Sequence, residues 1–174
     1  MDIKRVVTGY LEENCYIISD DKAALVIDPG DDYPKIEEAI AGKKVLGVLI
    51  THLHHDHIGA LKHFLKKRSI AILKKGNLEE REYTLGNFTF NVIFTPGHSK
   101  DSVTYYFKDI NTMFVGDFIF KNDVGRWDLP GGSEEEMKQS ITKIKAYEKD
   151  TILYPGHGDE TTLDSEIKNN IYFK

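Results

Sequence analysis

The sequence predicts an α/β domain in which layered β-strands are covered by a few helices. Two observations lead to this prediction. Short runs rich in Val, Ile, Phe and Tyr alternate with polar turns along the whole chain, as expected of pleated, half-buried strands. Between and after these runs lie segments with apolar residues three and four positions apart, which is the helical period. Because the chain has 174 residues and is 40% apolar, we expect a single domain over residues 1–174.

The predicted strands are short segments bounded by turn-forming residues. They are Arg5–Val7, Cys15–Ser19, Ala24–Ile27, Val45–Ile50, Ile70–Leu73, Phe88–Phe94, Ser102–Phe107, Thr112–Val115 and Thr151–Tyr154. The polar stretch Lys108–Asn111 separates two of these strands closely enough to form a hairpin turn.

Four segments have a helical pattern. The first begins at Pro34, a residue that suits the first turn of a helix, and the second spans about His57–Lys67. The third begins at Ser133, whose hydroxyl can cap the helix while Glu136 reaches back in a capping box. The last predicted helix spans about Leu163–Ile171.

Composition excludes several classes of protein. The chain has 28 acidic and 23 basic residues, and this net charge of −5 argues against a general nucleic-acid or anionic-membrane binder. The lone cysteine, Cys15, excludes an internal disulfide framework, and we expect it to be buried in a strand. No apolar run approaches the roughly 20 residues that cross a bilayer, and the first residues lack the apolar core of a signal peptide. We therefore expect a cytoplasmic protein without nucleic-acid or membrane partners.

One short segment concentrates the donors that zinc and borderline transition metals prefer. His52, His54, Asp56 and His57 form the pattern H-x-H-x-D-H directly after the predicted strand Val45–Ile50. The alternative interpretation is an accidental His-rich surface turn.

Three further donors lower the weight of that alternative. His98, Asp117 and His157 each follow an apolar strand run, and each lies in a turn that contains glycine. Glycine lets the backbone bend tightly, so that a ligand can project over the end of its strand. Loops at one end of a sheet system can then converge on a single pocket.

The number of donors favours two metal ions. Five histidines and two aspartates are too many for one tetrahedral site and too few for two closed sites. They fit two ions that share a bridging ligand, with the open positions left to a bridging water or hydroxide, which is typical of a catalytic site. The expected ligands are His52, His54 and His98 for the first ion, Asp56, His57 and His157 for the second, and Asp117 between them. We expect Asp56 also to orient the hydroxide. Zinc is the default metal, and iron or manganese also suits such a mixed site.

These residues resemble the metallo-β-lactamase fold superfamily, and in particular its short glyoxalase II-like hydrolases. The resemblance rests on the motif and downstream ligands above, on Asp28-Pro29-Gly30, on Gly116-Asp117 with Gly125-Arg126-Trp127-Asp128, and on Pro155-Gly156-His157-Gly158. It implies an αββα sandwich of two mixed β-sheets flanked by helices, with the metals at one edge. It also implies a thioester hydrolase of the hydroxyacylglutathione hydrolase type, which acts on a small acyl-thiol substrate as a monomer or homodimer.

Other activities on the same fold stay open. A mononuclear non-haem iron persulfide dioxygenase would use only His52, His54, His98 and Asp117, and another esterase or lactonase or a scaffold with a dead site is a further alternative. The presence of Asp117 argues against lactam hydrolysis, because true metallo-β-lactamases usually lack an aspartate at the bridging position. Full-length glyoxalase II enzymes bind glutathione largely through a C-terminal helical region. Only 17 residues follow His157 here, so the thiol carrier is left open.

Two residues and one segment each have two interpretations, and one further histidine has no assigned function. Asp28 is either a plain turn residue or the acceptor for the outer N–H of a ligand histidine. Arg126 either pairs with Asp128 or binds an anionic group of the substrate. The basic segment 62–75 is either a solvated surface or a patch that steers the substrate. We expect His55 to be exposed, and we assign it no role.

Overall fold

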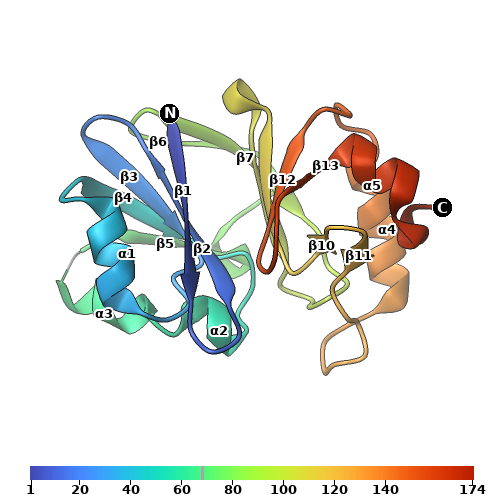
Figure 1. Cartoon of the computed structure of the whole chain (residues 1–174), viewed down its shortest axis with the longest axis horizontal. Helices are drawn as coiled ribbons and strands as arrows, with labels where there is room; N and C mark the ends of the chain where they lie inside the picture. Colours follow the sequence, from blue (N-terminus) through green and yellow to red (C-terminus); the bar gives the residue numbers. More distant parts are fainter. Residues whose placement is uncertain (68) are drawn as a thin grey trace.

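The strands of the computed structural model, which describes residues 1–67 and 69–174, form two mixed β-sheets packed face to face. Helices cover the outer face of each sheet (Figure 1). The predicted αββα sandwich is therefore confirmed. Among the described residues, no helix combines the length and the apolar character needed to cross a lipid bilayer.

The first sheet contains the N-terminal strands in sequence order. Neighbouring strands are antiparallel from β1 to β3 and parallel from β3 to β5. The strand β2 is buried along its whole length because both of its faces are covered, which explains the consecutive apolar residues Cys15–Ile18 at its centre. The five strands are β1 Asp2–Thr8, β2 Glu13–Ser19, β3 Ala23–Ile27, β4 Lys44–Leu49 and β5 Ala71–Leu73.

The second sheet has the strand order β13-β12-β9-β8-β7-β6. Strands β12 and β9 are parallel and the other neighbours are antiparallel. The strands are β6 Glu82–Leu85, β7 Phe88–Phe94, β8 Val103–Phe107, β9 Thr112–Gly116, β12 Ile152–Pro155 and β13 Thr161–Thr162, and a separate hairpin is formed by β10 Ile119–Phe120 and β11 Asp123–Val124.

Three apolar layers hold the sandwich together. The inner layer joins the two sheets, with Tyr16 and Leu25 facing Phe90 and Phe114. An outer layer packs the helices α1 Tyr33–Ile40 and α3 Leu61–Lys67 on the first sheet. The other outer layer packs α4 Glu134–Ile144 and α5 Leu163–Asn169 on the second sheet. Figure 1 shows these two pairs of helices at opposite sides of the molecule.

The sheets are also tied by polar bonds near the edge that carries the predicted ligands. The buried Tyr105 hydroxyl of β8 lies 2.8 Å from the carbonyl oxygen of Ile50 and 2.9 Å from that of Leu73. The Val103 N–H donates to the carbonyl oxygen of Thr51 at 2.8 Å. These bonds fix the chain just after β4, which is where the H-x-H-x-D-H segment begins.

Several local predictions are confirmed. Residues Lys108–Ile110 form a short 3₁₀ turn between β8 and β9, as expected for the hairpin. The Ser133 hydroxyl accepts the N–H of Glu136 at the start of α4. Cys15 is fully buried, and burial raises the pKa of its thiol.

The predicted helix over His57–Lys67 is wrong as a single element, because the structure divides it into α2 His55–Ile58 and α3 Leu61–Lys67. The N–H of Ala60 leaves the helical pattern and donates to the carbonyl oxygens of Gly30 at 2.8 Å and Pro29 at 3.0 Å. The Asp28-Pro29-Gly30 turn therefore accepts the backbone N–H that would otherwise continue the helix, and the helix is interrupted at Ala60. The last helix ends at Asn169, and the short strands β6, β10, β11 and β13 were not predicted.

Candidate metal centre

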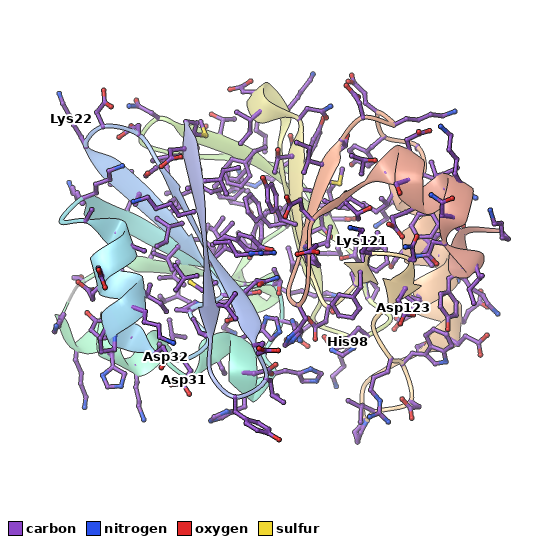
Figure 2. All side chains as sticks on the ribbon, in the orientation of Figure 1. Lys22, Asp31, Asp32, His98, Lys121 and Asp123 are labelled. Atoms are coloured by element: carbon purple, nitrogen blue, oxygen red, sulfur yellow. The ribbon has the colours of Figure 1, made fainter. Side chains whose placement is uncertain are left out.

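The segments that follow four strands bring the predicted ligands to one edge of the sandwich. His52 and His54 follow β4, and the short helix α2 carries Asp56 and His57. The remaining donors follow strands of the second sheet: His98 after β7, Asp117 after β9 and His157 after β12. Figure 2 shows His98 at the lower centre, between the two halves of the molecule. The structure therefore brings all of the predicted ligands together.

The first donor group consists of His52, His54 and His98. The Nδ1 atom of His54 lies 3.1 Å from Nε2 of His52 and 2.9 Å from Nε2 of His98. Three imidazole nitrogens thus converge within 4.8 Å of one another, as ligands of one ion would.

The second donor group consists of Asp56, His57 and His157. Oδ2 of Asp56 lies 3.2 Å from Nε2 of His157 and 3.7 Å from Nε2 of His57. This group also has its donor atoms within 4.8 Å of one another.

Asp117 lies between the two donor groups. Its Oδ1 is 3.3 Å from Nε2 of His57, and its Oδ2 is 3.6 Å from Nε2 of His157. The same Oδ2 is 3.7 Å from Nε2 of His98 and 4.0 Å from Nε2 of His52. One carboxylate therefore faces histidines of both groups, which is the position of a bridging ligand.

Two buried atoms in this centre have no hydrogen-bond partner among the described residues. They are Nε2 of His57 and Oδ1 of Asp117. A buried polar atom without a partner costs about 1–3 kcal/mol, and native proteins rarely leave one in place. A divalent cation held between them would give both atoms a partner, so the residues fit a metal site.

The outer ring nitrogens of four of the histidines contact oxygen atoms, which leaves the inner nitrogens of these rings facing the centre. The outer Nδ1 contacts are His57 with Asp28 Oδ2 at 2.9 Å, His98 with the Arg126 carbonyl oxygen at 2.8 Å, His157 with the Leu11 carbonyl oxygen at 3.0 Å and His52 with the Thr51 hydroxyl at 3.1 Å. Asp28 is therefore an acceptor for a candidate ligand histidine, and the plain-turn interpretation is wrong.

Burial and local charge set the protonation of the donors. Burial lowers the pKa of both His52 and His98, which favours the neutral ring that a metal needs. Burial alone raises the pKa of Asp117, but the contact and charge of His57 outweigh it and hold the carboxyl ionised. A hydrogen bond from His157 lowers the pKa of Asp56 to about 2.

The pKa of His57 is shifted in the opposite direction to that of His52 and His98. Burial lowers its pKa, but the contacts with Asp117 and Asp28 outweigh burial and raise the pKa well above 6.5. In the metal-free protein the ring is therefore protonated, and a cation bound at Nε2 would take the place of that proton.

Glycines allow the donors to approach one another. A Cβ on Gly156 would lie 2.3 Å from Oδ1 of Asp117 and 2.6 Å from Cε1 of His57. A Cβ on Gly125 would lie 1.8 Å from the carbonyl oxygen of Asp117. Side chains at these two positions would therefore displace the donors.

The centre opens into a cleft of about 580 Å³ whose lining combines the donors with apolar side chains such as Leu11, Phe120 and Leu129. Arg126 stands at its rim and pairs with Asp128 through two short contacts, at 2.7 Å and 2.8 Å. A more enclosed cavity of about 440 Å³ lies beside α4 and contains none of the donors.

Three residues near the centre were missed by sequence reasoning. Glu13 is buried and its Oε1 lies 3.8 Å from Nδ1 of His57. Thr51 bonds to both Asp28 and His52. Asp123 adds a further carboxyl group to the lining of the cleft. Only the adjacency of Thr51 to the motif could have indicated a role, because Glu13 and Asp123 lie in polar stretches that resemble ordinary turns.

The remaining polar candidates lie outside the cleft. His55 is exposed, as expected. In the basic segment 62–75, the side chains of Lys62, Lys66 and Lys67 are exposed, and none of the described lysines lines the cleft. This agrees with a solvated surface, and Arg68 of that segment lies outside the described residues.

The sequence is similar to a family of known proteins. The model of the metallo-β-lactamase superfamily matches residues 8–81 and 75–157. A probable metallo-hydrolase of Bacillus subtilis, YqgX, is 32% identical, and the alignment covers 98% of this chain and 96% of the relative. The hydroxyacylglutathione hydrolase GloC of Haemophilus influenzae is 28% identical, and the alignment covers 98% of this chain and 97% of the relative.

Solved structures agree as well. The crystal structure of the B3 metallo-β-lactamase BLEG-1 superposes with a TM-score of 0.93 at 31% identity, and covers 99% of this chain and 100% of that chain. TTHA1623, solved in a di-iron-bound form, superposes with a TM-score of 0.89 at 29% identity, with 97% and 99% covered. The chain therefore belongs to the metallo-β-lactamase superfamily. This membership, with the converging histidines and aspartates, supports a metal-dependent hydrolase.

Proposed function

We propose that the chain is a binuclear metal-dependent hydrolase that cleaves small acyl thioesters. The observation that carries the proposal is the position of Asp117, whose two carboxylate oxygens face histidines of both donor groups. His52, His54 and His98 would hold one ion, Asp56, His57 and His157 the other, and Asp117 would bridge them. The curated relative named hydroxyacylglutathione hydrolase supports a thioester as substrate.

Zinc, iron and manganese all suit this donor set. The similarity to a structure in a di-iron-bound form supports a site for two ions and keeps iron among the candidates. The buried, unpaired thiol of Cys15 agrees with a reducing compartment, and we propose a cytoplasmic location for this enzyme, acting as a monomer or homodimer.

Two bound divalent ions would supply activated water, because they lower its pKa from about 16 to about 7, and they would polarise the acyl carbonyl. The protein's part is to place the groups. The Asp56 carboxylate, ionised because its pKa is about 2, faces the cleft and orients the attacking water. Asp117 holds the two donor groups at a fixed separation. The apolar lining, including Leu11 and Phe120, offers the acyl group an apolar surface to contact.

The kind of leaving group that the site can release depends on whether an acid is positioned to protonate it. Among the described residues that line the cleft, the histidines and the aspartates 56 and 117 are all donors of the centre. The remaining carboxyl, Asp123, is exposed and accepts the N–H of Val124. A departing amine needs a proton from a fixed acid, whereas a thiol with a pKa of about 8.5 leaves as the anion. The site is therefore matched to thioesters.

A matched substrate series tests this function. Compounds that share one acyl group are compared as thioester, activated oxygen ester and unstrained amide, and a β-lactam is included because BLEG-1 is a metallo-β-lactamase. We expect kcat/KM to fall in the order thioester, oxygen ester, amide, with weak β-lactam hydrolysis. Comparable rates on the amide would overturn the proposal, and the variant Asp123→Asn would then show whether Asp123 is the acid that was overlooked.

The mononuclear iron persulfide dioxygenase remains the alternative. It needs only His52, His54, His98 and Asp117, and it would leave the buried Nε2 of His57 without a partner. Oxygen consumption on glutathione persulfide, with one iron per chain, would favour that activity over hydrolysis.

A further inference from the structure

A buried carboxyl group outside the donor set lies next to the second donor group, and burial raises its pKa. Glu13, at the start of β2, is only 1% exposed. Its Oε2 accepts the hydroxyl of Thr8 at 2.7 Å, and that hydroxyl in turn accepts the N–H of Asp31 at 3.0 Å. Its Oε1 has no hydrogen-bond partner in the part of the chain that the structure describes, and it lies 3.8 Å from Nδ1 of His57.

A second buried glutamate in the same chain shows what an ordinary structural carboxylate looks like. Glu166 accepts the hydroxyl of Thr161 at 2.6 Å, with the same spacing of five residues as Thr8 and Glu13. Its other oxygen accepts the N–H of Asn122 at 2.9 Å and the side-chain amide of Asn170 at 2.8 Å. Glu166 is thus fully bonded, whereas one oxygen of Glu13 is directed at a candidate metal ligand.

The Gly30 turn connects Glu13 to the helix α2. A Cβ on Gly30 would lie 2.3 Å from Oε2 of Glu13 and 2.1 Å from the carbonyl oxygen of Asp56, so the turn is held tightly between them. The N–H of Ala60 donates to the carbonyl oxygen of Gly30 at 2.8 Å, which anchors the end of α2 on the same turn. Figure 2 shows the next residue, Asp31, at the lower edge of the molecule, close to the β1–β2 hairpin.

The same hairpin also holds the third member of the second donor group. Glu13 and His157 form a β-bridge, and the Asn14 N–H donates to the carbonyl oxygen of Gly156 at 2.7 Å. The outer nitrogen of His157 contacts the carbonyl oxygen of Leu11. Residues 8–14 therefore contact or support Asp56, His57 and His157.

The first donor group is supported elsewhere. The outer nitrogen of His52 contacts Thr51, and the outer nitrogen of His98 contacts the carbonyl oxygen of Arg126. Among the described contacts, none joins residues 8–14 to His52, His54 or His98. Within the described residues, the segment 8–14 thus supports the second donor group and not the first.

We infer that Glu13, held by Thr8, is a positioning residue for the second metal site, and that the pair controls occupancy of this site independently of the first. The inference rests on the proposed binuclear function. The Thr8–Glu13 pair acts by holding neighbouring groups in place. Glu13 lies beside the outer nitrogen of His57, and the Gly30 turn packed on Glu13 fixes α2. Loss of the Thr8 bond should therefore allow both Asp56 and His57 to move.

Metal binding of four variants tests this. Thr8→Val removes the hydroxyl without changing the shape, Thr8→Ser restores it, and Glu13→Gln keeps an acceptor for Thr8 but turns an N–H toward His57. Thr161→Val is the matched control at the other buried threonine–glutamate pair. Zn²⁺ affinities of the two sites are measured by competition with a chromophoric chelator. We expect Thr8→Val and Glu13→Gln to weaken the second site about 10- to 100-fold and leave the first unchanged, with Thr8→Ser and Thr161→Val behaving as wild type.

Amide hydrogen exchange of the metal-free protein gives a readout that does not depend on metal. The Ala60 N–H should exchange faster in Thr8→Val than in wild type or Thr161→Val, because the turn that accepts it is loosened. Equal weakening of both metal sites, or unchanged binding in both Thr8→Val and Glu13→Gln, would overturn the inference. If wild type binds only one ion, the binuclear proposal fails, and Ala60 exchange alone decides whether the pair positions α2.

Discussion

Oδ2 of Asp28 lies 2.9 Å from Nδ1 of His57, and Oδ1 of the same carboxylate accepts the N–H of Thr51 at 2.7 Å. Thr51 directly precedes His52, and its hydroxyl contacts the outer nitrogen of that ring. Asp28 therefore supports a histidine in each donor group, whereas Glu13 contacts the second group alone. This difference separates the effects expected of the two buried carboxylates.

Replacing Asp28 by Asn should weaken both metal sites. The amide removes the charged acceptor for His57 and alters the bonds to Thr51, and loss of such a supporting contact typically costs about 10- to 100-fold in metal affinity. The measurement is chelator competition at both sites. Asp20→Asn is the control, because Asp20 also accepts backbone N–H groups but lies in a turn outside the centre. An Asp28→Asn protein with wild-type affinity at both sites would show that this support is dispensable.

Replacing Asp117 by Ala should lower kcat/KM on the thioester by orders of magnitude. The substitution removes the carboxylate whose oxygens lie near histidines of both donor groups, so both sites should lose affinity. His55→Ala should leave the rate nearly unchanged, because His55 is exposed and does not line the cleft. Equal damage from the two substitutions would mean that the ligands in the motif are wrongly assigned.

Replacing Gly156 by Ala should disrupt the centre without removing a donor. The new methyl group would lie within 2.3 Å of Asp117 and 2.6 Å of His57, and such overpacking typically costs about 1–3 kcal/mol. We expect lower metal content and a lower midpoint in chemical denaturation. Gly76→Ala is the control, because a Cβ there would meet the flexible end of the Lys74 side chain, at 3.2 Å, and no backbone atom of the described residues. Equal metal content in both variants would contradict the tight packing at Gly156.

The Asp56–His157 pair should give the metal-free protein a defined pH dependence. The hydrogen bond from His157 lowers the pKa of Asp56 from 3.8 to about 2, so the stability it contributes is present above pH 3.8 and lost as the pH falls through about 2. Burial lowers the pKa of His157, but the bond to Asp56 outweighs burial and raises it above 6.5. Its contribution is therefore present below pH 6.5 and lost as the pH rises through the raised value.

The pair should thus stabilise the metal-free protein most between pH 3.8 and 6.5. In His157→Ala, an NMR titration should find the pKa of Asp56 shifted from about 2 toward 3.8. The difference in unfolding free energy between wild type and this variant should be largest in the same window. A difference that does not change with pH would contradict the pairing.

The fold could be predicted largely because its strands and donors have strong local signals. Continuous apolar runs such as Cys15–Ser19 mark buried strands, and each donor follows such a run in a glycine-containing turn. The predicted helix boundaries were wrong where contacts between distant parts of the chain determine them. The break at Ala60 arises from carbonyl oxygens of Pro29 and Gly30, about 30 positions earlier in the sequence, and no helical periodicity reveals it.

The supporting residues of the centre were harder to predict than the donors. Histidines in a spaced motif are rare, whereas Glu13 stands in the polar stretch before a strand, where a glutamate usually faces solvent. Its burial results from the Gly30 turn folding over it, which is a long-range contact. Arg126 shows the converse, because its side chain pairs with Asp128 while its backbone carbonyl supports His98. A side-chain interpretation of the sequence cannot anticipate a backbone role.

The metal-to-chain ratio tests the central claim most directly. Protein saturated with Zn²⁺, freed of excess metal by gel filtration and quantified by amino-acid analysis, is measured by inductively coupled plasma mass spectrometry. Two donor groups that share Asp117 predict two ions per chain. A ratio that stays at one under saturating metal would contradict the binuclear centre and favour the mononuclear alternative.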